Sequence, residues 1–466
     1  MADTRAPSPS TPGHGPRHAA DTAPDTADTA PGAAADPAPD PAARLRSPAY
    51  LRLLLLAAVL GVPVSAAAYY FLQLVAVLQR WVFADLPRLL GFAGTPVWWP
   101  LPVLAVAGVL VALTISRLPG TGGHEPADGF APGGAPRVAE LPGVLLAAVT
   151  SLALGVVLGP EGPLIALGAG LGVCAVRLSR RDVPDEAAAV VAASGSFAAI
   201  SALLGSPILG AFLLMEASGL GGAILGLVLV PGLLAAGVGT LVFVGLDSLT
   251  GFGAVSLALP GLPPFGHPDV AQFGYALLIG LLAAVLGTGV RRLALLVRPH
   301  VAGHRLLVTP VVGLVVGGLA VLYAMTTGHP GSEVLFSGQS AMGPLLSNSG
   351  GYSVGVLLVL VLCKSLGYGL SLSAFRGGPV FPSMFIGAAG GLALSHLPGL
   401  PLVAGVAMGI GAMCVVMLRL PMTSVLLATL LLFSDGLAVM PLVIVAVVTA
   451  HVAAAWLAPV FAVSRR

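Results

Sequence analysis

The sequence predicts an all-α polytopic membrane protein whose membrane domain is duplicated, and three observations support this fold class. Hydrophobic residues make up 57% of the chain and charged residues only 9%, whereas soluble domains average about 25% charged residues. From Arg46 onward the chain is almost continuously apolar, which is typical of packed membrane helices. Two Gly/Pro-rich segments, 159–172 and 378–391, also match each other at a constant spacing.

Residues 1–45 form a segment rich in Pro, Ala, Asp and Thr that has no apolar face to bury. This composition predicts disorder. The segment contains no apolar core of the kind found in secretory signal peptides, so membrane insertion must depend on the internal helices. We therefore expect a disordered tail over 1–45 and a membrane domain over 46–466, with halves of roughly 46–250 and 251–466.

The membrane domain divides into candidate helical spans separated by Gly, Pro and polar residues. These spans are 50–80, 98–117, 141–158, 163–178, 187–204, 207–217, 221–246, 270–297, 306–326, 352–372, 382–397, 401–418, 421–433 and 436–457. A perpendicular span needs about 20 apolar residues, and several candidates, 207–217 above all, are shorter. Short helices beside Gly/Pro breaks predict re-entrant pieces, which are tolerated where they are buried in protein or line an aqueous cavity.

The duplication is visible as five identical residues in two Gly/Pro breaks, each followed by a helix of small residues. All five are separated by 219 positions (378 − 159 = 219): Gly159/Gly378, Pro160/Pro379, Pro163/Pro382, Gly168/Gly387 and Gly172/Gly391. A second pair of short helices begins at Pro207 and Pro421, at an offset of 214 (421 − 207). Because Gly and Pro are common in this chain, chance matches are the alternative. Paired breaks in corresponding halves favour a transport site at the repeat interface.

Arginines flank both ends of the predicted membrane domain. Arg44, Arg46 and Arg52 surround the start of the first span, and Arg465 and Arg466 follow the last one. The positive-inside rule then places both termini in the cytoplasm. The last span lies close to the end of the sequence, so we expect no appended soluble domain.

Glu161 is a carboxylate at the opening of a predicted helix, between Pro160 and Gly162. An ionisable residue inside the membrane is costly and is by default a functional residue. Free N–H groups and the positive end of the helix dipole make such a helix start an anion site. We expect Glu161 to act as a tethered anion that vacates the site when it is protonated or displaced. The alternative is a first-turn Glu that only stabilises its own helix.

Glu216 is the second acid within an apolar stretch. It follows Pro207 by nine residues, which places it about 13–14 Å along the helix axis at ~1.5 Å per residue. Since the residues between are apolar, Gly or Ala, we expect its carboxylate to reach a water-filled vestibule or a membrane face. An interfacial glutamate whose carboxylate extends to water is the alternative.

A further break, at residues 120–125, reads Gly-Thr-Gly-Gly-His-Glu and follows the span that ends near Ser116. It can direct the Thr121 hydroxyl and nearby N–H groups at an anion, although such a loop is usually an ordinary turn. We expect His124 to cap backbone groups or contact solvent rather than bind a metal.

Several function classes are disfavoured. The 21 basic and 19 acidic residues give a net charge of +2, which is not the basic footprint of a nucleic-acid-binding protein. Cys174, Cys363 and Cys414 lie in apolar stretches without CxxC spacing, which predicts packed thiols rather than a metal site or disulfide. Ser194 with the later His451 resembles an intramembrane serine protease only in part, because no glycine lies two residues before the serine and no His-Glu-x-x-His occurs. We therefore do not expect an enzyme.

Together the three breaks resemble the filter segments of the CLC family of chloride channels and proton/chloride antiporters. The family's first segment reads G-S-G-I-P-E, and residues 120–125 stand in its place. Its second, G-R/K-E-G-P, is matched by residues 159–163, and its third, G-x-F-x-P, is approximated by residues 378–382. The resemblance covers roughly residues 46–466 and indicates the short bacterial type.

The resemblance implies a homodimer in the lipid bilayer of the cell membrane, with one anion pathway per subunit built from two inverted halves. Glu161 matches the family's gating glutamate, Glu216 its second proton-handling glutamate, and Thr121 its central-site serine. Phe461 ends a Pro-Val-Phe that resembles the family's Pro-x-Tyr, whose hydroxyl contacts the anion. The other anion-contact positions are Gly122, Gly162, Pro379, Val380 and Phe381, and the other filter positions are Gly120, Gly159, Pro160, Pro163, Gly378 and Pro382.

Three residues depart from the family pattern. Phe461 offers no hydroxyl, and Pro379 and Pro160 have no backbone N–H; Pro160 also replaces the family's Arg or Lys. These losses predict weaker chloride binding, a changed anion preference or looser coupling. The resemblance implies exchange of chloride or a similar small anion against protons, with chloride as bound substrate and no cofactor. A passive voltage- or pH-gated chloride channel of the same fold is the alternative.

Overall fold

The computed structural model describes most of the membrane domain. The described residues are 46–130, 135–179, 185–219, 222–252, 263–432 and 436–460. The tail over 1–45 and Phe461 lie outside these ranges, so the predictions made for both stay predictions. Residues from Ser47 onward belong to one compact unit.

Within the described ranges the secondary structure is helical, with no named strand. The first half contains α2 (Pro48–Arg80), α3 (Leu86–Leu89), α4 (Pro100–Arg117), α5 (Leu141–Ala153), α6 (Glu161–Ser179), α7 (Asp185–Leu204), α8 (Pro207–Ser218) and α9 (Gly222–Thr250). The second half contains α10 (Val270–Gly303), α11 (Arg305–Thr327), α12 (Gln339–Ser347), α13 (Val354–Ala374), α14 (Val380–Leu394), α15 (Leu402–Leu418), α16 (Pro421–Leu430) and α17 (Gly436–Val460). Short π or 3₁₀ turns are η1 (Trp81–Asp85), η2 (Pro126–Asp128), η3 (Val138–Glu140), η4 (Gly331–Glu333) and η5 (Ser349–Gly351).

Helix lengths agree with a multi-pass membrane protein. Nine helical segments of the described chain are long and apolar enough to cross a membrane. Shorter apolar segments, of the kind predicted from the Gly/Pro breaks, are Val138–Ala153, Pro207–Ser218, Val380–Leu394, Leu402–Leu418 and Pro421–Leu430. The prediction of an all-α polytopic protein with short helices is confirmed.

Two details differ from the predicted spans. The span predicted over 141–158 ends as a helix at Ala153, because Gly155 adopts a φ of +94° that turns the chain out of the helix. The helix α12 was not predicted, because Gln339 and Ser347 at its ends interrupt the apolar pattern that identified the other helices.

The sequence repeat is also a repeat of helix packing. A Cβ added to Gly168 of α6 would lie 2.3 Å from the carbonyl oxygen of Gly195 in α7, and one added to Gly387 of α14 would lie 2.3 Å from that of Gly409 in α15. These contact pairs are related by offsets of 219 (387 − 168) and 214 (409 − 195). The five-residue slip seen in the sequence therefore falls between α6 and α7, and the close helix packing before and after it is preserved.

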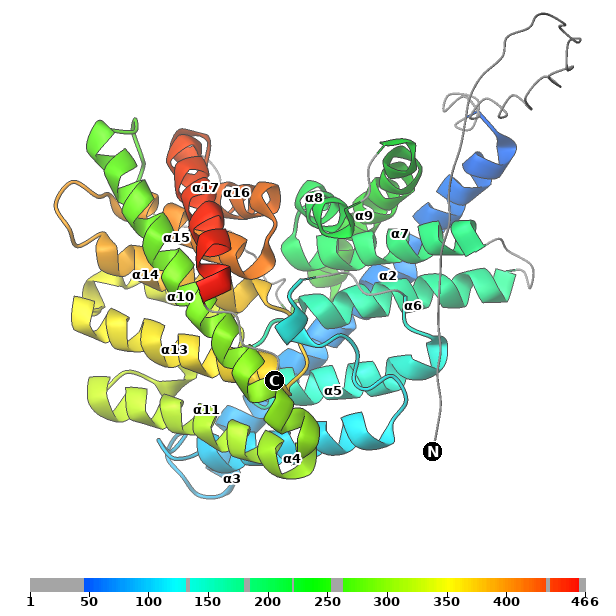
Figure 1. The fold of residues 1–466 in the computed structure, drawn as a ribbon. Coiled ribbons are helices and arrows are strands. Elements are labelled where there is room, and N and C mark those ends of the chain that lie inside the picture. Colours follow the sequence, from blue (N-terminus) through cyan, green and yellow to red (C-terminus); the bar gives the residue numbers. More distant parts are fainter. Residues whose placement is uncertain are drawn as a thin grey trace, which may run out of the picture. The chain divides into compact units, whose positions relative to one another are not determined.

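The two breaks contact each other directly. Gly159 and Gly378 form an isolated antiparallel bridge, in which each N–H donates to the other's carbonyl at 2.8 and 2.6 Å. An antiparallel pair of equivalent residues has a local twofold axis, the relation expected between inverted repeats. Figure 1 shows α6 and α14 extending from this centre into opposite halves of the membrane domain.

Side chains continue this local symmetry. The N–H of Val157 donates to the hydroxyl of Ser371 at 3.3 Å, and the N–H of Arg376 donates to the hydroxyl of Ser151 at 3.3 Å. Val157 and Arg376 are again 219 positions apart (376 − 157). Each half therefore fixes the segment before the other half's break with a buried serine.

Candidate anion and proton site

Glu161 lies at the centre of the site, at the first position of α6. Its side chain is wholly buried, and its Oε1 accepts the N–H of Phe381 at 2.8 Å. Phe381 belongs to the first turn of α14, whose N-terminal Pro379 supplies no side-chain cap. The carboxylate of the first half thus caps a helix of the second half, where the helix dipole favours negative charge.

The second carboxylate oxygen is held without a donor. Oε2 of Glu161 is buried and has no hydrogen-bond partner among the described residues. Its space depends on the two bridged glycines, since a Cβ on Gly378 would lie 1.8 Å from Oε2 and a Cβ on Gly159 would lie 2.3 Å from it. The repeated glycines therefore leave room for the carboxylate as well as forming the bridge.

The three breaks predicted from the sequence converge on one cavity of about 330 Å³. Its lining includes Gly120, Gly122 and Gly123 of the first break, Gly162 and Pro163 of the second, and Gly377 and Pro379 of the third. Glycines and prolines supply few side-chain atoms, so much of this wall is backbone. Such a wall suits a small ion that is recognised by N–H groups.

Thr121 contributes its backbone to this region. It has a φ of +48°, one of three positive values at non-glycine residues in the described chain. Its carbonyl oxygen accepts from Nε and Nη2 of Arg376, both at 3.3 Å. The contact made by Thr121 is thus a carbonyl contact, whereas the sequence drew attention to its hydroxyl.

The remaining filter residues are buried around Glu161. Val380, Phe381 and Pro382 all lie in the buried first turn of α14. Pro379 has no N–H to give, and its carbonyl instead accepts the hydroxyl of Tyr368 at 2.8 Å. The carbonyl of Pro160 accepts the N–H of Leu164, which continues α6.

Glu216 has a partner that the sequence did not reveal. Its Oε1 accepts the N–H of Met422 at 2.9 Å, and its Oε2 accepts the N–H and the hydroxyl of Thr423 at 2.8 and 2.7 Å. These donors form the first turn of α16, so a helix N-terminus binds the carboxylate, and its access to a vestibule or membrane face stays a prediction. The only signal available beforehand was Pro421, the repeat counterpart of Pro207.

The two acids follow one rule. Glu161 on α6 caps α14, and Glu216 on α8 caps α16. By the repeat offsets, α14 and α16 are the counterparts of α6 and α8. Each of these two carboxylates is therefore bound by the N-terminus of the helix that duplicates its own.

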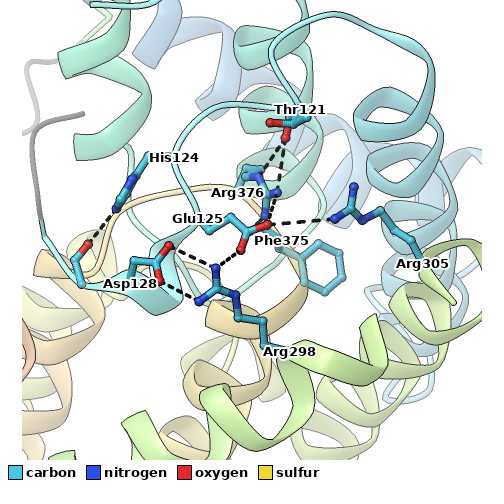
Figure 2. A network of polar contacts seen from close by, with 9 residues as sticks. Thr121, His124, Glu125, Asp128, Arg298, Arg305, Phe375 and Arg376 are labelled. Atoms are coloured by element: carbon cyan, nitrogen blue, oxygen red, sulfur yellow. Dashed lines mark hydrogen bonds and ion pairs between the residues drawn. The ribbon is translucent and has the colours of Figure 1, made fainter. Parts of the chain in front are cut away.

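Arg376 is the site residue that sequence reasoning missed. It is 4% exposed, lines the cavity beside Gly377 and Pro379, and contacts both Thr121 and Glu125. Figure 2 shows it at the centre of a network that extends to α10 and α11. A signal was present, because Arg376 is the one charged residue of the break before α14, where the break before α6 has Val157.

Comparison with known proteins places the chain among anion-transport proteins. The family described as "Voltage gated chloride channel" matches residues 126–455. The "Putative ion-transport protein YfeO" of Escherichia coli O1:K1 / APEC is 30% identical over 365 residues, which cover 76% of this chain and 82% of that protein.

Solved structures show the same fold. A "slow cyanobacterial Cl-/H+ antiporter" matches with a TM-score of 0.70 at 20% identity, covering 89% of this chain and 99% of that one. A "CLC-type fluoride/proton antiporter" matches with a TM-score of 0.64 at 19% identity, covering 86% of this chain and 95% of that one.

Proposed function

Because the chain belongs to the voltage-gated chloride channel family, we propose that it carries chloride or a similar small anion in exchange for protons. The observation that carries this proposal is the buried Glu161 carboxylate on the N–H of Phe381. A negative group held by a helix N-terminus marks a place where a mobile anion can bind, since the same donors and dipole attract both. The matched antiporter structures support exchange as the form of transport.

The exchange follows from competition for one site. A proton on Glu161 removes its charge and weakens its bond to the N–H of Phe381, so that an anion can take that donor. Loss of the proton restores the carboxylate, which displaces the anion. By resemblance, further anion contacts come from Thr121, Gly122, Gly162, Val380 and Phe461, with Pro379 lining the path without an N–H.

We assign the second proton-transfer role to Glu216. Its carboxylate is bound at the N-terminus of α16 rather than at that of α14, where Glu161 lies, so it can take up protons without competing for the donor at Phe381. Three donors from the first turn of α16 hold it in place. Both acids are present, which favours exchange over a passive channel.

The enzyme alternative receives no support from the serine that suggested it. Ser194 is buried in α7, and its hydroxyl donates to the carbonyl of Val190 at 2.8 Å. A nucleophilic serine needs a base that accepts its proton. We therefore propose a transporter that is not an enzyme and that needs no metal or other cofactor.

The assembly that we propose is a homodimer in the cell membrane with both termini cytoplasmic. Large apolar side chains are exposed on α9 and α17, among them Leu241, Leu249 and Trp456. Such surfaces fit lipid or a second copy of the chain. The 1–45 segment is proposed to be a cytoplasmic tail outside the transport domain.

Flux measurements test the proposal directly. Purified protein in proteoliposomes should release chloride, and an opposing anion gradient should drive protons uphill; nitrate and fluoride compared in parallel give the anion preference. Anion flux without proton movement would instead support the channel alternative. Correctly folded protein that moves neither ion would contradict transport of these ions, and cleavage of a helical substrate would revive the enzyme alternative.

A further inference from the structure

Arg376 makes an unusual set of contacts for a buried cation. Its Nε and Nη2 both donate to the carbonyl oxygen of Thr121 at 3.3 Å, and Nη1 donates to the carbonyl of Phe375 at 3.3 Å. Nη2 also donates to Oε1 of Glu125 at 3.2 Å (Figure 2). Two nitrogens of the Arg376 guanidinium therefore bind the carbonyl oxygen of the Thr121–Gly122 peptide.

These hydrogen bonds fix the direction of the Gly122 N–H group. A trans peptide is planar, so its C=O and N–H point in opposite directions. With the Thr121 carbonyl turned to Arg376, the N–H of Gly122 must point away from the guanidinium. Gly122 is buried and lines the 330 Å³ cavity, and its N–H has no hydrogen-bond partner in the part of the chain that the structure describes. A buried N–H without a protein partner is a donor for an ion or a water.

The loop has little freedom to turn this peptide otherwise. Gly122 has a φ of +73°, and a Cβ there would lie 2.9 Å from Cγ1 of Ile115 and 3.3 Å from Cγ of Arg376. The aliphatic part of Arg376 thus packs on the same residue whose peptide its guanidinium holds. Removing Arg376 would release both constraints.

Ion pairs around the loop hold Arg376 in place. Glu125 is shared by Arg376, Arg298 and Arg305, and Arg298 also pairs with Asp128 at 2.6 Å. Glu140 lines the same cavity, so three arginines face three carboxylates around the loop. The ion pairs therefore anchor the Arg376 guanidinium and leave anion recognition to backbone N–H groups.

We propose that Arg376 is a positioning residue that sets anion affinity by orienting the Thr121–Gly122 peptide. It holds the carbonyl away from the path, so that the N–H of Gly122 is left to bind the anion. This inference rests on the proposed anion transport, and it assigns the role to a residue whose repeat counterpart, Val157, has no charge.

The test compares Arg376→Gln and Arg376→Lys in proteoliposomes. Gln removes the charge and the planar fork, and we expect KM for chloride to rise about tenfold, the effect of losing one charge-assisted hydrogen bond. Lys keeps the charge without the fork, so KM should rise by a smaller factor, about threefold. The proton-to-chloride ratio should stay unchanged, because Glu161 is intact. Arg88→Gln, at an exposed arginine of α3 outside the cavity lining, should keep the wild-type KM.

The outcomes separate the two proposals. A wild-type KM in Arg376→Gln, or a full return to wild-type KM in Arg376→Lys, would overturn the positioning role while leaving transport standing. Wild-type protein that carries no anion would instead overturn the proposed function. If Arg376→Gln does not fold, Arg376→Lys decides alone, because an unchanged KM contradicts the need for a two-nitrogen contact.

Discussion

The breaks before α6 and α14 differ at two paired positions. Glu161 in the break before α6 corresponds to Val380 in the break before α14. Arg376 in the break before α14 corresponds to Val157 in the break before α6. All four residues are buried, and both substitutions sit on the same offset of 219 (380 − 161 and 376 − 157). The two copies share one backbone geometry, but one carries an acid and the other a cation, each opposite a valine. The same backbone scaffold therefore holds a buried charged residue in one copy and a buried apolar residue in the other.

A third buried charge shows that burial alone does not indicate a transport role. Lys364 of α13 is 1% exposed, and its Nζ donates to the carbonyls of Glu333 and Leu335 at 2.9 Å. These bonds tie η4 and the following segment to α13, and Lys364 does not line the 330 Å³ cavity. Arg376 and Lys364 are both buried, so their different neighbours, rather than their burial, indicate their different roles.

The largest effect is expected from removing the acid that distinguishes the two breaks. Glu161→Gln should abolish proton movement while anion flux continues and loses its pH dependence, because the side chain can no longer change charge. Paired chloride and pH recordings from proteoliposomes measure both fluxes. Proton coupling that survives in the mutant would remove Glu161 from the gating role.

A smaller effect is expected from replacing either glycine of the Gly159–Gly378 bridge. Gly378→Ala should destabilise the protein by about 1–3 kcal/mol, as overpacking does, because its Cβ would lie 1.8 Å from Oε2 of Glu161. Gly159→Ala, at 2.3 Å, should cost less. Thermal unfolding in detergent gives the order, and Gly390→Ala in α14, with nothing within 4 Å of its Cβ, is the matched control. Equal stability of all three variants would contradict the packing of the carboxylate between the two glycines.

Replacing Glu216 should cause a partial loss of function. Glu216→Gln should reduce proton transport and spare anion permeation, because its carboxylate binds α16 and not the N-terminus of α14 where Glu161 lies. The same change removes the charge from three hydrogen bonds on α16, so stability should fall by roughly 1–3 kcal/mol. Measuring flux per folded protein separates the two effects. Equal loss of both fluxes in folded protein would point to a structural role only.

The last prediction concerns the hydroxyl that Phe461 lacks. Phe461→Tyr should tighten chloride binding by roughly 1.5–3 kcal/mol if its new hydroxyl reaches the anion. Thr121→Val keeps the side-chain shape and removes a hydroxyl, so it should weaken binding. Calorimetric titration of chloride into each variant provides the affinities. If neither substitution changes the affinity, these two side chains do not build the central site.

The sequence alone predicted the features that depend on local residue patterns. Hydropathy predicted the membrane helices, and Gly/Pro spacing predicted the repeat and the helix that opens at Glu161. The contacts of Arg376 with Thr121 and of Glu216 with Met422 join residues 255 and 206 positions apart. Such pairs leave no periodic signal in a single sequence, so helix packing had to reveal them.

The central claim is that the Glu161 carboxylate and the transported anion compete for the N-terminus of α14. Anomalous diffraction from bromide-soaked crystals of Glu161→Gln and of the wild-type protein tests it most directly. We expect a bromide peak within hydrogen-bond distance of the Phe381 nitrogen in Glu161→Gln, and a weaker peak or none there in the wild type at high pH. A bromide that binds elsewhere in both proteins, with the position at Phe381 empty of bromide in Glu161→Gln, would contradict the account.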